Sequence, residues 1–236
     1  MRLIFLDTET TGLLPEDRLC QVAYTVDGQS AAEFFLPPLP IKIEAMSVHH
    51  ITNKMLIGKA PFVGSQMHSD LAALLADEQT AVVAHNAAFD IEMLQREGLV
   101  IKNSICTLKV ARYFDRDGTQ PRFNLQYLRY LLDLDVEAVA HDAAGDVAVL
   151  ERLFANLFAR LKAELGTDSD EAVYSEMMMI SSRPSLIQRF NFGKHNGKRI
   201  DEVLLEDRRY LEWLLDQKRL SNGEEDWIYT LEHFLD

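Results

Sequence analysis

The chain has 236 residues, enough for one domain and a smaller additional one, and its 47% hydrophobic and 26% charged residues are ordinary for a globular protein. The net charge of −13 argues against a protein that coats nucleic acid by bulk electrostatics, although bound divalent cations can reverse the field inside a site. Two cysteines give no disulfide framework and favour a cytoplasmic location. No apolar run approaches the about 18 residues that a membrane span needs, so we expect neither a signal peptide nor a membrane partner.

The first part of the chain predicts a meander of strands. Residues 2–6 form the apolar run of a buried strand, and residues 21–27 and 31–36 are two further strands joined by a turn at Asp27-Gly28. A proline cluster at residues 37–40 then ends the sheet, because proline lacks the backbone N–H that a strand ladder uses.

Helices dominate the sequence after that cluster, with one further strand at residues 80–84. The predicted helices span residues 47–53, 69–76, 89–97, 107–114, 125–132 and 143–165. The last of them has a clear 3.6-residue apolar period, as an amphipathic helix does. Strands first and helices later, with one strand among them, indicate an α/β fold with a mixed sheet flanked by helices.

We expect an α/β domain at residues 1–165, a linker or helix at residues 166–182, and a small C-terminal α+β module at residues 183–236. The module begins with a basic segment in which Phe190 and Phe192 alternate with charges, and Asn196-Gly197 is a turn signal. Residues 190–200 therefore predict a hairpin, and residues 206–217 a helix. Two interpretations fit the hairpin, contact with DNA and docking onto the first domain.

The most informative motif is the end of the first strand, where Asp7 and Glu9 are two residues apart. Side chains at i and i+2 of a strand point to the same face, so both carboxylates would lie side by side. Two such charges repel unless a cation lies between them, and oxygen ligands favour Mg²⁺ or Mn²⁺. An exposed acidic pair at a strand end is the alternative interpretation.

Two further acids stand at predicted helix starts. Asp90 follows His85-Asn86 in the first turn of one helix, where a carboxylate also suits the helix dipole as a simple cap. His141 precedes the long helix, with Asp142 as its expected N-cap and Asp146 in its first turns. Together, four carboxylates and one histidine match the layout for hydrolysis at two metal ions, in which neutral histidine accepts the proton of water.

Three motifs carry a resemblance to a known family: Asp7-x-Glu9-Thr10-Thr11-Gly12-Leu13, His85-Asn86-x-x-Phe89-Asp90 and His141-x4-Asp146. In type, order and spacing they resemble the exonuclease motifs of the DEDD superfamily, and the last has the spacing of its histidine subclass, the DEDDh or DnaQ-like exonucleases. The resemblance implies a ribonuclease H-like fold. Residues 45–52 also resemble a short helix of the family, with His50 where the family usually has glycine. The tail from residue 183 resembles the C-terminal module of the exodeoxyribonuclease X type.

The resemblance implies roles for the five motif residues and two Mg²⁺ or Mn²⁺ ions per active site. Asp7 would bridge both ions, Glu9 and Asp146 would complete the site of the ion that activates water, and Asp90 would act on the second ion, partly through water. His141 would be the general base. The implied activity is removal of nucleoside 5′-monophosphates from DNA 3′ ends, in a single strand or at a duplex terminus, during repair or end processing.

Six residues are candidates for nucleic-acid contact: Thr8, Thr10, Leu13, His49, Asn86 and Phe89. The backbone around Thr8 and Thr10 would hold the terminal sugar, as the family implies. Leu13 and Phe89 would stack on or wedge under terminal bases, because base stacking tolerates any sequence, or would simply fill the core. His85 is interpreted as a hydrogen-bonding residue at a strand end.

Other functions stay open at this point. An exoribonuclease of the ribonuclease T or oligoribonuclease type shares the catalytic motifs, and tolerance of the 2′-hydroxyl is invisible in them. A polymerase proofreading subunit also shares them, although the tail does not look like a flexible polymerase-binding segment, so polymerase association is not indicated. A catalytically silent DNA-end binding protein is a further class. A homodimer is compatible with the sequence, but no interface is evident in it.

Overall fold

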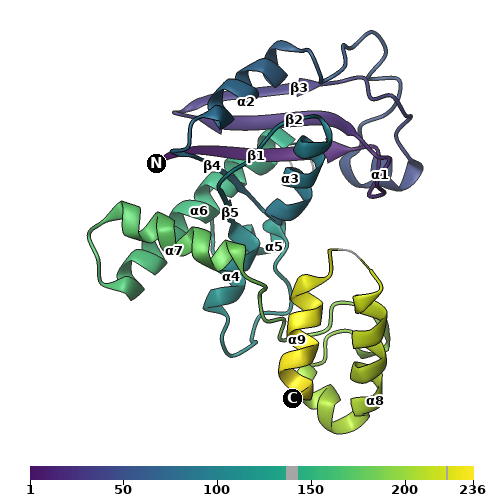
Figure 1. Ribbon diagram of the computed structural model, residues 1–236, viewed down its shortest axis with the longest axis vertical. Helices are drawn as coiled ribbons and strands as arrows, with labels where there is room; N and C mark the ends of the chain where they lie inside the picture. The colour runs from purple at the N-terminus through teal and green to yellow at the C-terminus, as the bar shows by residue number, and fades with distance from the viewer. Residues whose placement is uncertain (137–142, 222) are drawn as a thin grey trace.

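A computed structural model describes residues 1–136, 143–221 and 223–236 (Figure 1). Its five-stranded sheet has the order β3-β2-β1-β4-β5. The strands are β1 (Arg2–Thr10), β2 (Leu19–Val26), β3 (Gln29–Phe34), β4 (Thr80–Ala84) and β5 (Ser104–Cys106). The central strand β1 pairs antiparallel with β2 and parallel with β4, so the sheet is mixed and the predicted fold class is confirmed.

Helices cover both faces of this sheet. The helices among the described residues are α1 (Ile43–His49), α2 (Gln66–Ala76), α3 (Ala87–Arg96), α4 (Thr107–Phe114), α5 (Leu125–Leu131), α6 (Ala143–Leu165), α7 (Asp170–Ser182), α8 (Ile200–Arg219) and α9 (Glu225–Leu235). The last two, α8 and α9, belong to the C-terminal module and do not cover the sheet. The helices α2 and α3 pack on one face, and α6 packs on the other together with α4, α5 and α7. The site motifs on β1, α3 and α6 are therefore carried by the central strand and by one helix from each side.

The side chains of β1 alternate between two separate hydrophobic clusters, one on each face of the sheet. Ile4 and Leu6 are fully buried in the cluster that includes α2 and α3, whereas Leu3 and Phe5 pack against the cluster of α4 and α6. Successive strand side chains point to opposite faces, so the odd-numbered residues of β1 all face α6. This alternation places the side chains of Asp7 and Glu9 on the face of the sheet that α6 covers.

Several predicted elements are confirmed with their bounds. The strand β4 and the helices α4 and α6 begin and end at the predicted residues. The first helix differs, because it spans Ile43–His49 instead of residues 47–53. The short strand β5 and the helix α9 are present without having been predicted, and residues 170–182 of the expected linker or helix form α7.

The C-terminal module (residues 183–236) has its own buried cluster around Phe190, Leu211 and Trp227. Figure 1 shows α8 and α9 side by side at the end of the molecule opposite β3. The predicted chain reversal is present, because Arg189 and Arg199 form an antiparallel bridge and the Phe190 N–H donates to the Lys198 carbonyl, but the arms form no regular strands and the turn type differs. Asn196 has a φ of −48°, whereas the expected type I′ turn needs a positive φ there.

Among the described residues, no helix is long and apolar enough to cross a membrane. The expectation of no membrane partner was based on the lack of a long apolar run in the sequence.

Candidate active site

Asp7 and Glu9 lie on β1 and face the same side as Leu3 and Phe5, toward α6. Asp146 lies in the first turn of α6, packed against the same strand. One carboxylate oxygen from each of these three residues lies within 4.8 Å of the other two. The structure thus brings together three of the four predicted carboxylates from segments more than 130 residues apart in sequence.

This group of three carboxylates fits a divalent cation. Its donors are all carboxylate oxygens, the hard ligands that Mg²⁺ and Mn²⁺ prefer. Asp146 is buried and the other two are half-buried, so their mutual repulsion is poorly screened by water. A bound cation would relieve that repulsion, and the three residues are placed to hold one.

Gln126 positions Asp146. Its side-chain amide, in the first turn of α5, donates a hydrogen bond to Oδ1 of Asp146. The bond holds the orientation of the Asp146 carboxylate. Sequence reasoning missed Gln126, because a lone glutamine in a helix carries no motif and the contact spans 20 residues.

Asp90 lies in the first turn of α3 and contacts β1 through Thr8. It is 4% exposed, and the hydroxyl of Thr8 donates a hydrogen bond of 2.7 Å to its carboxylate. Burial raises the pKa of Asp90 to about 7, and the hydrogen bond from Thr8 partly opposes that rise. Asp90 is not part of the group within 4.8 Å, so its role at a metal ion stays a prediction.

His141, the predicted general base, lies outside the described residues, as does the expected N-cap Asp142. The description resumes at Ala143, the first residue of α6 and three residues before Asp146.

Leu13 belongs to a loop that leaves the end of β1. Its side chain is 79% exposed and that of Leu14 is also exposed, so neither fills the core. The hydroxyl of Thr10 donates to the Gly12 carbonyl at 2.8 Å, which ties the loop to the strand. Leu13 thus lies on the loop that follows β1 with its apolar side chain in solvent, and its role as a wedge at a terminal base stays a prediction.

The remaining candidates for nucleic-acid contact, Asn86, His49 and Phe89, differ in their exposure to solvent. Asn86 is exposed and adopts a φ of 65° directly before α3, so its side chain can reach a ligand. His49 is buried, and its ring accepts from the Ile51 N–H and contacts the Thr10 carbonyl at 3.1 Å. We therefore expect His49 to position the backbone of β1. Phe89 is half-buried against the core cluster of α2 and α3.

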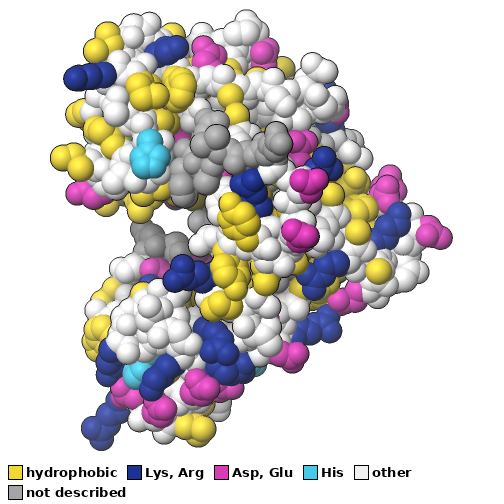
Figure 2. Space-filling view, turned by 180° about the vertical axis from the view of Figure 1, so that it is seen from behind, with side chains coloured by type: hydrophobic (Ala, Val, Ile, Leu, Met, Phe, Trp, Pro, Cys, Tyr) yellow, Lys and Arg dark blue, Asp and Glu magenta, His cyan; other side chains and the backbone are white. Residues whose placement is uncertain are grey.

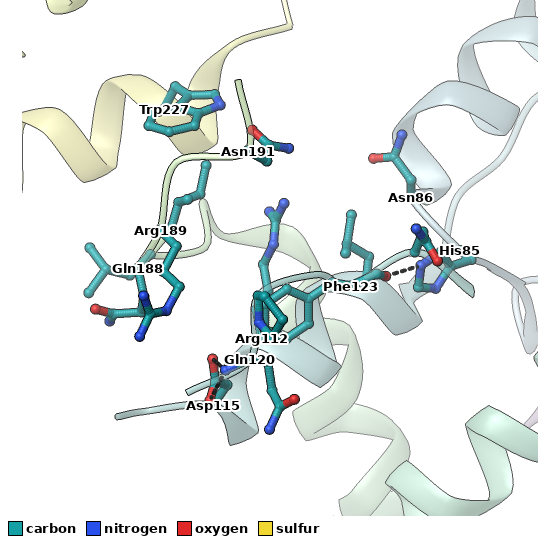
Figure 3. A pocket seen from close by; sticks show the side chains of 15 residues that line it. His85, Asn86, Arg112, Asp115, Gln120, Phe123, Gln188, Arg189, Asn191 and Trp227 are labelled. Atoms are coloured by element: carbon teal, nitrogen blue, oxygen red, sulfur yellow. Dashed lines mark hydrogen bonds between the residues drawn. The ribbon is translucent and has the colours of Figure 1, made fainter. Parts of the chain in front are cut away.

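His85 has a structural environment. Its Nε2 donates to the Phe123 carbonyl at 2.7 Å (Figure 3). Its Nδ1 lies 3.0 Å from the Thr107 hydroxyl. Burial lowers the pKa of His85 to about 4, so the ring is neutral near pH 7. These contacts agree with its interpretation as a hydrogen-bonding residue at the end of β4.

Comparison with known proteins adds two family matches. A family model described as Exonuclease matches residues 4–154, and one described as Exodeoxyribonuclease X-like C-terminal matches residues 190–219. The first spans β1 through most of α6 and so includes every carboxylate of the candidate site.

Individual proteins and solved structures are also similar to this chain. Exodeoxyribonuclease 10 of Escherichia coli (strain K12) is 28% identical over 250 aligned positions, which cover 99% of this chain and 99% of the relative. The epsilon subunit of DNA polymerase III from Treponema pallidum (strain Nichols) is 33% identical over 165 positions, covering 65% of this chain and 74% of that protein. Among solved structures, exonuclease X in complex with 5′ overhanging duplex DNA has a TM-score of 0.55 and 23% identity, covering 76% of this chain and 99% of that chain. This last likeness shows that the two proteins share the fold.

Proposed function

The chain belongs to the exonuclease family, and from that premise we propose that it is a metal-dependent 3′→5′ exodeoxyribonuclease. The observation that carries the proposal is the approach of Asp7, Glu9 and Asp146 oxygens to within 4.8 Å at the end of the central strand. DNA as the substrate is supported by the full-length similarity to an exodeoxyribonuclease of Escherichia coli.

Asp7, Glu9 and Asp146 hold the cation in this proposal, and Gln126 keeps the Asp146 carboxylate turned toward it. Divalent cations bound there supply positive charge that acidifies an attacking water and stabilises the leaving oxygen. Asp90 completes the site of a second ion. His141 accepts the proton of the attacking water, as a neutral imidazole near pH 7 is able to do.

The substrate strand enters with its 3′ end at the carboxylates. The backbone of residues 8–10 holds the terminal sugar, Leu13 lies against the last base, and Asn86 contacts the strand. The product is a nucleoside 5′-monophosphate. The cellular role that fits this activity is DNA repair or processing of DNA ends.

Proofreading is a second candidate, favoured by the 33% identity to a polymerase epsilon subunit. That similarity covers 65% of the chain, whereas the exodeoxyribonuclease relative matches 99% of it. The further match of residues 190–219 to an exodeoxyribonuclease X-like C-terminal family therefore supports the first candidate more. Co-purification with a polymerase would reverse this order.

The decisive experiment is digestion of 5′-labelled and 3′-labelled oligonucleotides, as single-stranded and duplex DNA and as RNA, with Mg²⁺ and then with EDTA. We expect stepwise loss from DNA 3′ ends in Mg²⁺ and no digestion in EDTA. Asp7→Ala should abolish digestion, while Asp168→Ala, which removes an exposed carboxylate from a loop, should leave it unchanged. Trimming of RNA alone would replace the proposal with an exoribonuclease, and inactivity on every substrate would contradict both.

A further inference from the structure

A cavity of about 360 Å³ lies at the junction between the C-terminal module and the rest of the chain (Figure 3). We call it the junction cavity. Its walls include Asn86 and Arg112 from the exonuclease part and Gln188, Arg189, Asn191 and Trp227 from the module. The volume lies near the lower end of the about 300–1,000 Å³ range of small-molecule sites, so it suits one small ligand group.

Polar contacts between the two parts hold the cavity open in one shape. Arg112 donates to the Asp226 carboxylate at 2.7 Å and to the Ser185 hydroxyl at 2.9 Å. Farther along the junction, the Arg189 Nε–H donates to the Gly118 carbonyl at 2.8 Å. These bonds fix the module against α4 and the loop after it, so the walls of the cavity are preformed.

The charges of the module are mostly compensated internally, and Figure 2 shows Lys and Arg mixed with Asp and Glu over its surface. Basic residues of the segment that was predicted as a hairpin pair with acids of α8: Lys194 with Asp207, Lys198 with Glu206, and Arg199 with Asp201. This segment is therefore a poor general surface for DNA, because its positive charge is already neutralised.

Arg189, which directly precedes that segment, differs from its basic residues. Within the part of the chain that the structure describes, no carboxylate lies within 4.0 Å of its guanidinium, whereas Arg112 across the cavity is paired with Asp226. Its Nε and Nη1 donate to the carbonyls of Gly118 and Gly197, which leaves the Nη2 donors for a ligand. A half-buried arginine oriented in this way is suited to a phosphate group.

Side-chain amides supply the other polar groups of the cavity. Asn86, Gln188 and Asn191 each offer both a donor and an acceptor, and Trp227 presents an aromatic edge (Figure 3). A cation for phosphate, amides for base or sugar edges and an aromatic wall together fit the chemistry of a nucleotide.

One residue of the cavity lining, Asn86, directly precedes the helix that carries Asp90. Asn86 caps α3 four residues before the site residue Asp90, and its side chain lines the cavity. We propose that the junction cavity binds a nucleotide of the substrate strand upstream of the scissile one, with its phosphate on Arg189 and its base or sugar near Asn86 and Asn191. This inference rests on the proposed exonuclease function and extends it by one subsite.

The test measures binding at the proposed subsite and hydrolysis at the active site in two separate assays. Binding of a fluorescent single-stranded oligonucleotide is measured by anisotropy in Ca²⁺ over a range of salt concentrations, for Arg189→Gln and Asn191→Asp. Hydrolysis of thymidine 5′-monophosphate p-nitrophenyl ester, which fills only the scissile position, is measured in Mg²⁺. We expect oligonucleotide affinity to fall about tenfold in either variant, because a charged hydrogen bond to phosphate is lost or opposed. Hydrolysis of the ester should stay at the wild-type rate.

The salt dependence of oligonucleotide affinity reports on phosphate contacts, and a loss of packing alone would leave it unchanged. Arg189→Gln should reduce the slope of log affinity against log salt by about 0.7, the value for one phosphate contact on a single strand. Arg189→Lys should retain most of that slope. Arg183→Gln and Asn196→Asp make matched charge changes in the module outside the cavity lining and should bind like the wild type.

The outcomes distinguish the two proposals. Unchanged oligonucleotide affinity in both cavity variants, with the ester hydrolysed, would overturn the subsite and leave the exonuclease function standing. No ester or DNA hydrolysis by the wild type, with strand binding that still depends on Arg189, would overturn the function and support the cavity. Competition by thymidine monophosphate as strong as that by the oligonucleotide would identify released product as the occupant and overturn the strand subsite.

Discussion

Gln126 illustrates how single residues outside the motifs shape the site. Its amide donates to Asp146, and Thr8 donates to Asp90, so two of the four acids have a fixed hydrogen-bond partner from another element. Such partners orient a ligand without touching the metal, and their loss usually lowers metal affinity or activity.

Gln126→Ala should therefore lower Mg²⁺ affinity or turnover about 10- to 100-fold while leaving the fold intact. The measurement is calorimetric titration of Mg²⁺ together with kcat on a DNA oligomer. Gln95→Ala, which truncates an exposed glutamine of α3, is the control. Equal behaviour of the two variants would show that Asp146 needs no such partner.

His85 predicts a pH dependence of stability. Burial lowers its pKa from 6.5 to about 4, so between these values the unfolded chain binds the proton more tightly than the folded one. The free energy of unfolding should fall as the pH decreases from about 6.5 to 4, by about 3 kcal/mol from this residue alone. Below that window both states are protonated and the loss is complete.

His85→Gln, which retains a side-chain N–H donor, isolates this contribution. Urea unfolding from pH 7 to 4 should give a wild-type stability that falls more steeply than that of the variant. Burial raises the pKa of Asp90, so Asp90 opposes the trend in the same window, and the difference between wild type and variant removes its effect. Parallel curves would contradict the prediction.

At the scale of elements, the loop after β1 is held by one buried acid. The Asp17 carboxylate accepts from the Thr11 hydroxyl at 2.7 Å and from Lys42 at 2.6 Å. Burial raises the pKa of Asp17, but these hydrogen bonds outweigh it and hold the pKa below its usual value. A Cβ on Gly12 would lie 2.6 Å from the Asp17 carboxylate, so glycine is required for this loop to close over it.

The exposed Leu13 on this loop predicts a difference between substrates. Leu13→Ala should slow digestion of a duplex terminus about tenfold, because an alanine no longer stacks at the terminal base pair, and should affect a single strand much less. Initial rates on matched duplex and single-stranded oligomers provide the measurement. Leu205→Ala, which truncates a leucine that is 88% exposed on α8, should change neither rate. An equal loss on both substrates would remove the wedge hypothesis.

Local patterns predicted some elements well and others poorly. The amphipathic period of α6 and the apolar run of β4 are encoded in adjacent residues, and their bounds were predicted. The first helix was placed too late, since it ends at His49 and is followed by His50, which adopts a φ of 61° where a residue without a Cβ is favoured. The segment predicted as a hairpin reverses direction but forms a single antiparallel bridge, and its Phe190 packs on Trp227 of α9.

At the scale of the whole molecule, Asp226 joins the module to the exonuclease part. It lies in the first turn of α9 and pairs with Arg112 at 2.7 Å and with Lys109 at 3.7 Å. Removing it would leave a half-buried arginine without its acid, which is more destabilising than the loss of a surface ion pair.

Asp226→Ala should lower the free energy of unfolding by about 2 kcal/mol and separate the unfolding of the module from that of the rest. Calorimetry would follow both transitions. Glu225→Ala removes an exposed carboxylate from the same turn and should leave a single transition near the wild-type temperature. A fully cooperative wild-type-like transition in Asp226→Ala would show that apolar contacts alone hold the junction.

The sequence by itself identified the family of this protein and the acids of its candidate site. Asp7 and Glu9 share a face because strand alternation is local, and the spacing of the three motifs identifies the exonuclease family without any contact being known. Only the tertiary structure decided which groups meet. Asp146 reaches the end of β1, Gln126 orients it, Asp90 contacts Thr8, and Arg189 faces a cavity. Each of these contacts joins residues distant in the chain, and their pairing depends on how the helices pack on the sheet, which no local period specifies.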